Sequence, residues 1–585
     1  MLWKNRTPYS KKFKDNYSSL KGPIEESKEV YIKANNLISR WKKLNKDDSF
    51  TIGEMGFGTG LNFLLTSYEW LEKSKSTQTL HYVSIEKYPV KIKDLIKAHS
   101  EKEKIETLCK ELISDYPVNC LGNHRILLGQ GRIQLTLIFE DVLEALGSID
   151  KTLFDAWYLD GFSPDRNPDM WTKKVLSYIS DLSHKDTTFS TFSSSSLVKE
   201  NLSKTNFKFE KITGFGTKRH MLKGKKKGNL KRSPKKTKKI AIIGAGLAGC
   251  VQAYILSKRG HEIDLYEENN TLVGGASGNP VLVTYPRFSP NDSLHSRFYL
   301  HSFLFSSRFY KNLASRGWSK TGVVVLSYDE QSRGREALLN SHNVDKKLFR
   351  KISRNEASKL TGIDLDYGGL FFPNGGIISP KDLCEDMVNS SNVNIFSKKT
   401  VSNIEKINRK FYISINDVNY EYDHICLCNS FDVNKLIKLN GISKKRGQIT
   451  YLKDTPGLEN LRMPICSQGY ISPDFELNKI LGSTYNDFLS LSIKQGDNLE
   501  NIKNFKKVYK GKVEAIGARA GYRAVTQDKL PFCGQYQGFY INTGHGSRGS
   551  ISIPMTSVSI ADEIDQKPNI LPRKIKKAIN PERFN

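Results

Sequence analysis

The stretch Lys223–Gly249, KGKKKGNLKRSPKKTKKIAIIGAGLAG, decides how the chain is organised. Its first part, Lys223–Lys239, carries ten Lys or Arg residues, two Gly, one Pro and no acid. Like charges in such a run repel one another and cannot bury a core, so we expect it to be extended and solvated. Its second part begins with a short apolar strand, Ile240–Ile243, and ends in a glycine turn. We therefore predict a linker at residues 223–239 between two domains, rather than an exposed basic loop inside one domain.

The domain after the linker, residues 240–585, opens with a dinucleotide-binding pattern. Gly244, Gly246 and Gly249 form G-x-G-x-x-G between the strand and an expected helix, and a second strand at 262–266 ends at Glu267, 23 residues after Gly244. This layout places a pyrophosphate at a helix N-terminus and a ribose on the acid. The pattern predicts a bound dinucleotide.

Two further glycine clusters favour FAD over NAD. Gly274–Asn279 offers small residues where a loop can approach an isoalloxazine ring, and Gly544–Gly549 follows a strand at 539–542 and precedes a helix expected from Ser550. Backbone N–H groups there can stabilise a reduced flavin. The region from about 281 to 505 mixes helices and strands, and we interpret it as an inserted α+β substrate domain. Besides the fingerprint residues, the expected FAD contacts are Ala276, Ser277, Gly278, Asn279, Gly544, Gly546, Ser547, Arg548 and Gly549.

The domain before the linker, residues 1–222, carries a different glycine loop. Gly56, Gly58 and Gly60 follow a strand end and precede a helix expected near Leu61, and no Gly-Lys-Ser/Thr follows them, which argues against a phosphate P-loop. Expected strands at 80–85 and 135–139 end in acids: Glu86, suited to ribose hydroxyls, and Glu140-Asp141, suited to an adenine edge. A glycine loop followed by two strand-end acids is typical of S-adenosylmethionine-dependent methyltransferases.

A fourth expected strand, at 153–159, runs into Asp160-Gly-Phe-Ser-Pro164. The loop after this strand lies beside the methyl donor in such folds. In a methyltransferase that acts on an amine, the neutral amine must sit in line with the sulfonium methyl, about 3 Å away. Asp160 can hold that amine and take its proton as a general base. The alternative is that Asp160 is only a turn or helix-capping residue.

Five motifs follow one another in the first domain: Glu54–Phe63, Ser84–Pro89, Asp155–Pro164, Asn167–Trp171 and Gly214–Leu222. With these motifs the domain resembles the methyltransferase half of the bifunctional tRNA 5-methylaminomethyl-2-thiouridine biosynthesis family over nearly its full length. The resemblance implies that Gly56, Gly58, Gly60, Glu86 and Asp141 hold S-adenosylmethionine and that Asp160 faces the amine. It also implies that Gly214–Leu222 forms a closing β-hairpin, with Lys218 and Arg219 near the RNA.

The second domain resembles the D-amino-acid oxidase and glycine oxidase superfamily, and in detail the oxidase half of the same bifunctional family. Gly521–Gly534 matches the segment whose arginine binds the substrate carboxylate, which implies this role for Arg523; a guanidinium holds a carboxylate in a bidentate way. The alternative for Arg523 is a surface ion pair. Arg446-Gly-Gln448 also matches, as structural or flavin-side support. The chain departs from the family at Pro280–Thr284 and at Asn429-Ser430, where a glycine is usual nearby.

Composition bounds the cellular setting and the partner. Of the net charge of +29, the linker supplies ten and leaves +19 on the rest, which favours a polyanionic partner, here tRNA. The eight Cys form no C-x-x-C pair, which predicts a reducing cytoplasm and neither disulfides nor a metal site. The polar N-terminus and the lack of a long apolar run predict neither a secretory signal nor a membrane span. We expect a cytoplasmic monomer.

The sequence therefore predicts an α/β protein in which a Rossmann-like methyltransferase is fused to an FAD-binding Rossmann domain. The resemblance implies action on the wobble uridine, position 34, of tRNA. The oxidase half removes the carboxymethyl group of 5-carboxymethylaminomethyl-(2-thio)uridine as glyoxylate, and the other half methylates the resulting amine. Two alternatives remain open: a fused amino-acid oxidase and amine methyltransferase acting on small molecules, and an RNA-binding protein with vestigial cofactor folds.

Overall fold

The computed structural model describes residues 1–4, 7–19, 22–100, 102–150, 152–216, 218–230, 236–286, 293–341, 345–453, 455–475 and 478–584. The chain forms two compact units, Met1–Lys236 with Asp562–Arg573, and Thr237–Ala561 with Lys574–Asn585. Asp562 explains why the late segment belongs to the first unit. Its buried carboxylate accepts hydrogen bonds from the Arg125 guanidinium (3.3 Å) and from the Ile570 N–H (2.9 Å).

The first unit is built on an eight-stranded sheet with the order β10-β11-β9-β8-β4-β5-β7-β6. The pairs from β9 to β7 are parallel, and the outer pairs are antiparallel. From β4 the strand order runs outward through β5 and β7 on one side and through β8 and β9 on the other. A ligand crevice is therefore expected where the order reverses, at the carboxyl ends of β4 and β8. The strands are β4 Ser49–Met55, β5 Thr79–Ile85, β6 Gly122–Leu128, β7 Ile133–Phe139, β8 Phe154–Leu159, β9 Ser183–Thr191, β10 Phe207–Thr213 and β11 His220–Lys226.

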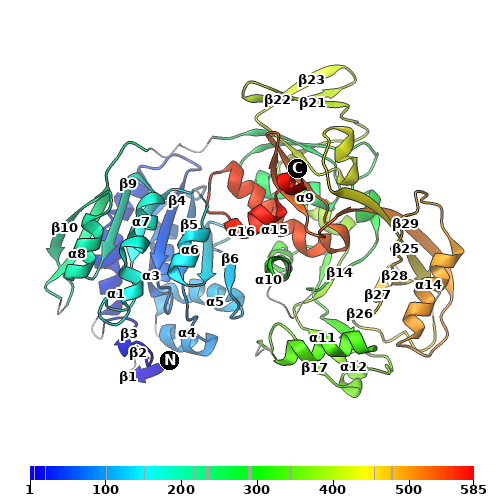
Figure 1. The fold of residues 1–585 in the computed structure, drawn as a ribbon, viewed down its shortest axis with the longest axis horizontal. Coiled ribbons are helices and arrows are strands. Elements are labelled where there is room, and N and C mark those ends of the chain that lie inside the picture. The colour runs from blue at the N-terminus through cyan, green and yellow to red at the C-terminus, as the bar shows by residue number, and fades with distance from the viewer. Residues whose placement is uncertain are drawn as a thin grey trace. The chain divides into compact units, whose positions relative to one another are not determined.

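Helices cover both faces of this sheet (Figure 1). One core packs α2, α3 and α5 against the sheet around Trp41, Phe63 and Leu112, and the other packs α6, α7 and α8 around Val142 and Val175. A small sheet of β1 Leu2–Lys4, β2 Thr7–Ser10 and β3 Asp15–Asn16 precedes them. The helices are α1 Pro23–Ser27, η1 Lys28–Lys33, α2 Leu37–Lys42, α3 Leu61–Lys73, α4 Ile92–His99, η2 Glu103–Ile105, α5 Glu106–Asp115, α6 Val142–Ser148, η3 Pro168–Trp171, α7 Lys173–Asp181 and α8 Ser196–Ser203.

The basic run differs at its ends from the expected solvated linker. Strand β11 continues through Lys226 because it pairs with both β9 and β10, and the ammonium groups of Lys223 and Lys225 form ion pairs with Glu210 and Asp186, each at 3.2 Å. Lys239 already belongs to β12, while residues 231–235 lie outside the described residues. In the segment at 214–222 expected as a hairpin, residues 220–222 begin β11, which pairs with β10, and the described residues 214–216, 218 and 219 lie between the two strands.

The second unit contains a six-stranded sheet with the order β20-β13-β12-β24-β31-β30, parallel except for its last pair. Its strands β12 Lys239–Ile243, β13 Glu262–Tyr266 and β31 Phe539–Thr543 correspond to the three predicted strands. The others are β20 Val393–Phe396, β24 His424–Leu427 and β30 Phe532–Tyr536, and the helices in the chain around them are α9 Leu247–Lys258, η4 Gly275–Gly278, α13 Pro380–Asn389, η5 Ser430–Lys435, η6 Gly546–Arg548, α15 Gly549–Ile564, α16 Arg573–Ile579 and η7 Pro581–Phe584.

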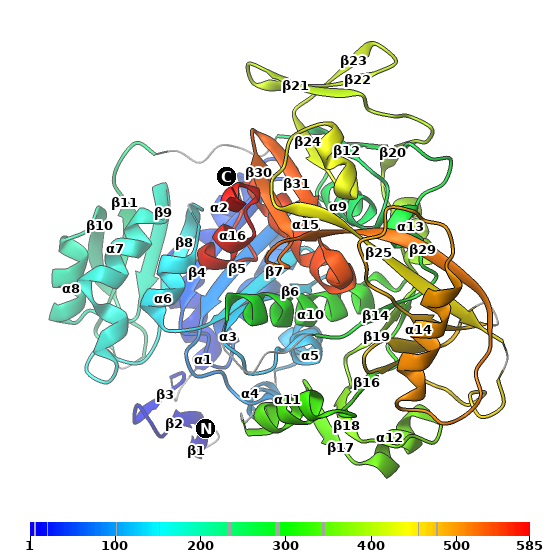
Figure 2. The same cartoon turned by 45° about the vertical axis from the view of Figure 1, so that its right-hand side comes forward.

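A second eight-stranded sheet has the order β17-β18-β16-β26-β27-β28-β25-β29 (Figure 2). Its strands are β16 Val323–Leu326, β17 Arg350–Ile352, β18 Gly369–Phe372, β25 Ile442–Leu452, β26 Ile465–Cys466, β27 Tyr470–Phe475, β28 Asn478–Gly482 and β29 Ala515–Thr526. The remaining elements are β14 Leu282–Thr284, β15 Trp318–Ser319 and β19 Gly376–Ile378; β21 Asn403–Ile407, β22 Lys410–Ile415 and β23 Val418–Tyr422; and α10 Leu294–Leu313, α11 Glu330–Ser341, α12 Arg354–Thr361 and α14 Gln495–Lys506.

The substrate region is therefore not one continuous insertion over 281–505. Strands β20 and β24 lie inside that range, yet they pair in parallel with β13 and β12 and so complete the dinucleotide-binding sheet. Strand β29 lies beyond residue 505, yet it pairs with β25 of the other sheet. Short strands such as β20, with four residues, give little sequence signal, and their membership is decided by pairing. The α/β class predicted for both halves is confirmed.

Candidate active sites

The glycine loop between β4 and α3 shapes a pocket of about 690 Å³ in the first unit. Gly56, Gly58 and Gly60 all have positive φ, at 85°, 55° and 76°. A Cβ atom at Gly56 would lie 3.2 Å from the Cα of Gly161, at the end of β8. The three predicted glycines thus allow a left-handed backbone and a close approach between the loops that follow β4 and β8.

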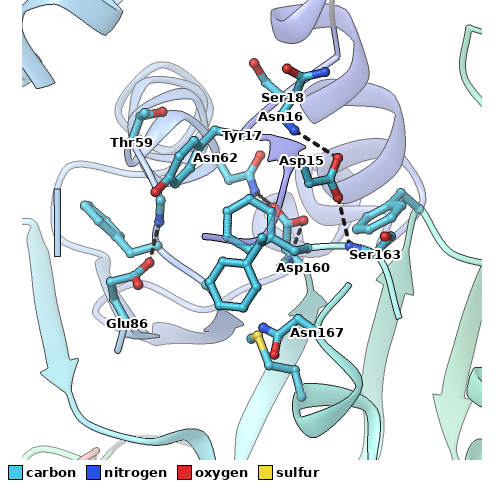
Figure 3. Close-up of a pocket in the computed structure, with 18 of the residues that line it drawn as sticks. Asp15, Asn16, Tyr17, Ser18, Thr59, Asn62, Glu86, Asp160, Ser163 and Asn167 are labelled. Carbon is cyan, nitrogen blue, oxygen red and sulfur yellow. Dashed lines mark hydrogen bonds between the residues drawn. The ribbon is translucent and has the colours of Figure 1, made fainter. Parts of the chain in front are cut away.

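Glu86 ties the glycine loop to the end of β5. Its carboxylate, labelled in Figure 3, accepts hydrogen bonds from the N–H groups of Gly58 (2.9 Å) and Tyr88 (2.7 Å). Burial raises the pKa of Glu86, and these two N–H groups oppose the shift. Each carboxylate oxygen retains a lone pair that can accept a ligand hydroxyl.

Asp141 lies on the same pocket, at the end of β7. One oxygen caps α6 by accepting from the Leu143 N–H (3.0 Å), and the other pairs with the Lys87 ammonium (2.9 Å). Partial burial acts to raise the pKa of Asp141, but the hydrogen bond and charge of Lys87 outweigh it and lower that pKa. Asp141 is therefore held as an anion beside the pocket.

Asp160 lies in the pocket at the carboxyl end of β8. Its Oδ2 accepts from the Asn62 amide (2.7 Å) and its Oδ1 from the Gly161 N–H (2.8 Å). Burial raises the pKa of Asp160 to about 6, and hydrogen bonds from Tyr31, Gly161 and Asn62 limit the rise. The side chain is therefore ionised at neutral pH and close enough to neutrality to accept a proton.

Asn62 was not singled out from the sequence, and the structure gives it a central place (Figure 3). Its Nδ2 donates to Asp160 and also to Glu54 (3.1 Å), while its Oδ1 accepts from the Ser27 hydroxyl (2.6 Å). Burial raises the pKa of Glu54 to about 8, although the Ser84 hydroxyl bonds its carboxyl (2.6 Å). Glu54 is thus protonated at neutral pH, and Asn62 links one neutral and one ionised carboxyl group.

An aromatic wall completes this pocket. The Phe13 ring stacks on Phe162 with 4.5 Å between centroids, and Tyr17 meets the same ring edge-on at 5.2 Å. Lys218 also lines the pocket: its ammonium pairs with Glu26 (3.2 Å) and lies 4.0 Å from the Phe192 ring centroid. Arg219 is exposed and does not line the pocket. The N-terminal aromatics gave no signal in the sequence because no motif links residues 13–17 to the loop after β8.

The second unit holds a pocket of about 640 Å³ around the predicted dinucleotide fingerprint. Gly244 has φ +95°, and a Cβ atom there would lie 2.7 Å from the Cα of Asn429. A Cβ atom at Gly249 would lie 1.8 Å from the Gly244 carbonyl oxygen, so this glycine permits close packing of α9, while Gly246 lines the pocket itself. These are the three uses of glycine in a pyrophosphate-binding turn.

Glu267, at the end of β13, faces the same turn. Its carboxylate accepts from the Ala245 N–H (2.8 Å) and from the side-chain amide of Asn269 (2.7 Å). The acid at the expected ribose position is therefore fixed by the backbone of the fingerprint.

The short helix η4 brings the Ala276–Asn279 group beside the turn. The Ser277 hydroxyl accepts from the Leu247 N–H (3.1 Å), and the Asn279 side chain accepts from the Arg519 guanidinium (2.7 Å). A Cβ atom at Gly278 would lie 2.3 Å from that guanidinium, so glycine leaves room for Arg519. Ala276, Ser277 and Asn279 line the pocket, and Gly278 does not. The sequence did not single out Arg519.

The C-terminal glycine loop closes the other side of this pocket. Gly544 and Gly546 have positive φ, at 74° and 55°. Arg548 directly precedes α15, and its guanidinium lies 4.7 Å from the ring centroid of Tyr285. All six residues from 544 to 549 line the pocket. The three glycines of this loop and the helix start fit the flavin end of FAD.

Arg523 extends from β29 into the same pocket. Its guanidinium donates to the Ser483 hydroxyl (2.5 Å) and to the Thr484 carbonyl (3.3 Å), and burial lowers its pKa. None of the ion pairs among the described residues engages Arg523, which argues against the alternative of a surface ion pair. The Arg523 guanidinium thus faces the pocket with no carboxylate partner among the described residues.

Arg446 has a different setting, as expected of structural support. Its fully buried guanidinium pairs with Asp497 and donates to the Gln448 side chain (2.9 Å) and the Ser492 carbonyl (2.7 Å). These contacts fasten α14 and the loop before it to β25.

Family models match both halves of the chain. A model of S-adenosyl-L-methionine-dependent methyltransferases matches residues 103–227, and a model of FAD dependent oxidoreductases matches residues 239–563. The FAD model alone covers more than half of the chain. Both cofactor assignments made from the sequence are confirmed at the level of the domain.

Curated relatives match from end to end. A protein of Legionella pneumophila (strain Corby) named "tRNA 5-methylaminomethyl-2-thiouridine biosynthesis bifunctional protein MnmC" is 32% identical over 649 residues, covering 100% of this chain and 96% of the relative. A protein of the same name from Methylobacillus flagellatus is 30% identical over 617 residues, covering 100% and 95%.

Solved structures match the second unit. Glycine oxidase from Geobacillus kaustophilus aligns with a TM-score of 0.51 at 18% identity, covering 60% of this chain and 100% of that one. L-proline dehydrogenase from P. horikoshii aligns with the same TM-score and identity, covering 60% and 98%. At this identity the likeness shows the fold alone.

Proposed function

The chain belongs to the family of bifunctional tRNA 5-methylaminomethyl-2-thiouridine biosynthesis proteins, and on this basis we propose how its two pockets divide the work. It is a tRNA-modification enzyme with an S-adenosylmethionine-dependent methyltransferase domain and an FAD-dependent oxidoreductase domain. The oxidoreductase domain removes the carboxymethyl group of 5-carboxymethylaminomethyl-(2-thio)uridine at position 34, and the methyltransferase domain then methylates the amine.

The observation that carries the division is the opposite charge at the centre of the two pockets. The first centres on an ionised acid, Asp160, suited to an amine. The second centres on the guanidinium of Arg523, which pairs with no carboxylate among the described residues. It is suited to bind the carboxylate of a substrate. The substrate of the oxidation carries a carboxylate. The substrate of the methylation has lost that carboxylate and carries a free amine.

In the oxidoreductase unit, Arg523 would hold the carboxylate and so orient the adjacent C–H and C–N bonds. The pyrophosphate of FAD would lie on the turn of Gly244 and Gly246, and its ribose on Glu267. When bound, FAD supplies the acceptor for two electrons. Oxidation and hydrolysis of the C–N bond release glyoxylate and leave the aminomethyl group.

In the methyltransferase unit, Gly56, Gly58, Gly60, Glu86 and Asp141 would hold S-adenosylmethionine. Asp160 would accept a hydrogen bond from the amine and take its proton as the N–CH₃ bond forms and the S–CH₃ bond breaks. The aromatic wall of Phe13, Tyr17 and Phe162 would keep water away from the reacting atoms. Asn62 would fix the direction in which Asp160 presents its carboxylate.

Nucleoside analysis tests the proposal. Transfer RNA from cells lacking this protein should accumulate 5-carboxymethylaminomethyl-(2-thio)uridine, and the purified chain with S-adenosylmethionine should convert it to the methylaminomethyl form. An unchanged nucleoside profile would contradict the function.

We also propose that the chain acts as a cytoplasmic monomer without a bound metal ion. No helix in the described ranges has both the length and the apolar character needed to cross a bilayer. Light scattering on a size-exclusion column and metal analysis of the purified protein test the monomer and the absence of metal.

A further inference from the structure

The loop at residues 484–494 lies between β28 and α14 (Figure 1), and several of its apolar side chains are exposed to solvent. Leu489, at its tip, is 88% exposed. Close groups of exposed large apolar side chains are unusual on a soluble surface and mark places where something binds. The exposed members of the loop are Tyr485, Phe488, Leu489, Leu491 and Ile493.

The 484–494 loop is held firmly at both ends. The Arg446 backbone exchanges two hydrogen bonds with that of Asn486 (2.8 and 3.0 Å), and its guanidinium donates to the Ser492 carbonyl (2.7 Å). The Gln448 side chain accepts from the Lys494 N–H (3.0 Å) and donates to the Lys494 carbonyl (2.8 Å). Arg446 and Gln448, already noted as structural, thus clamp this loop. Its apolar tip is displayed by a fixed scaffold.

The 484–494 loop borders the pocket that contains Arg523. Leu491 lines that pocket, and the Tyr485 ring centroid lies 5.9 Å from the Arg523 guanidinium. The Tyr522 hydroxyl, one residue before Arg523, donates to the Leu489 carbonyl. The nucleotides next to a uridine whose carboxymethyl arm reached Arg523 would therefore lie beside this loop.

Lysines flank the exposed rings. The Lys494 ammonium lies 3.2 Å from the Phe488 ring centroid, and the Lys445 ammonium lies 6.0 Å from that of Tyr485. Lys445 also pairs with Asp487, while none of the ion pairs among the described residues engages Lys494. Aromatic and apolar faces beside cations suit unpaired nucleobases and their phosphates better than they suit another protein surface.

We propose that the 484–494 loop is a stacking platform for the unpaired bases that adjoin the modified uridine of the tRNA. Phe488 and Leu489 receive base faces, and Lys494 meets a backbone phosphate. The inference rests on the proposed oxidoreductase function. It adds a feature that makes the enzyme prefer tRNA to the free modified nucleoside.

The test compares the unmodified holoenzyme with a Phe488→Ser, Leu489→Ser double variant. Anaerobic bleaching of the flavin is followed against increasing tRNA that carries 5-carboxymethylaminomethyluridine, and separately against the free modified nucleoside. The half-saturating tRNA concentration should rise about tenfold, as expected for the loss of one stacked base, and the nucleoside response should stay unchanged. Ile407→Ser, at an exposed apolar residue on β21, is the matched control and should leave both responses unchanged.

Three results would overturn the proposal. An unchanged tRNA response would remove the loop from recognition, and an equal loss with nucleoside would make it a lid over the pocket. Light scattering that shows the double variant losing a self-association of the unmodified chain would make the loop an interface between copies. If the unmodified holoenzyme bleaches with neither substrate, the proposed function itself fails, and this is distinguishable because the variant plays no part in that result.

Discussion

The two pockets differ in what surrounds their central charge, and the proposed function assigns each charge to one form of the same uridine. In the first unit, Asp160 is buried beside a second carboxyl group and is held by the amide of Asn62. In the second, Arg523 is held by the hydroxyl of Ser483 and the carbonyl of Thr484 and faces open pocket. The acid has a pKa tuned toward proton transfer, whereas the guanidinium remains charged and can only bind and orient. Under the proposed function, one pocket would carry a general base, and the other a carboxylate anchor.

The largest expected effect comes from removing the anchor. Arg523→Ala should slow carboxymethyl removal about 10³-fold, because a carboxylate brought into a desolvated pocket would lose its partner. The protein should stay yellow, since the turn near Gly244, which would hold the FAD pyrophosphate, is left intact. Arg523→Lys keeps the positive charge but lacks the two parallel N–H donors of the guanidinium, so it should slow carboxymethyl removal less. Stopped-flow flavin reduction measures both variants, and normal reduction in Arg523→Ala would contradict the role.

Removing the base should cost about 10²-fold in methylation and leave flavin reduction unchanged. Asp160→Ala is the variant, and incorporation of the methyl group from labelled S-adenosylmethionine is the measurement. In the unmodified chain, methylation should rise as the pH is raised through about 6, because Asp160 must be ionised to take the proton. A flat profile between pH 5 and pH 7 would remove Asp160 from proton transfer.

A smaller effect separates positioning from proton transfer. Asn62→Ala should lower methylation about tenfold and move the rise in the pH profile upward, because the hydrogen bond that favours ionised Asp160 is lost. Glu54→Gln should stay within about twofold at neutral pH, because Glu54 is already protonated there and the amide has the same shape. A drop with an unmoved pH profile would reduce Asn62 to a structural residue.

Local patterns predicted most of the fold and the glycine turns. Strand-end acids such as Glu86 and Glu267 followed from their place after apolar runs, and the structure sets them against the predicted loops. Asn62, Phe13 and Arg519 escaped notice because their roles depend on contacts between segments distant in sequence. The sheet to which β20 and β24 belong likewise depends on pairing with strands distant in sequence.

One departure from the family pattern has a structural counterpart. Ser430 stands near a position where the family usually has glycine, and its φ is +58°, in the left-handed region that favours glycine. The Thr543 hydroxyl donates to the Ser430 carbonyl (2.8 Å) and helps to hold this conformation. Ser430 therefore has a backbone conformation that glycine adopts more readily.

Crossing the two pocket variants with the two tRNA forms tests the central division most directly. Arg523→Ala and Asp160→Ala are each incubated with tRNA carrying the carboxymethylaminomethyl group and with pre-made aminomethyl tRNA, and the wobble nucleosides are identified by mass. We predict that Arg523→Ala leaves the first tRNA unchanged and fully methylates the second, while Asp160→Ala converts the first to the aminomethyl form and stops there. Failure of Arg523→Ala to methylate aminomethyl tRNA, or of Asp160→Ala to produce it, would contradict two independent pockets acting in sequence.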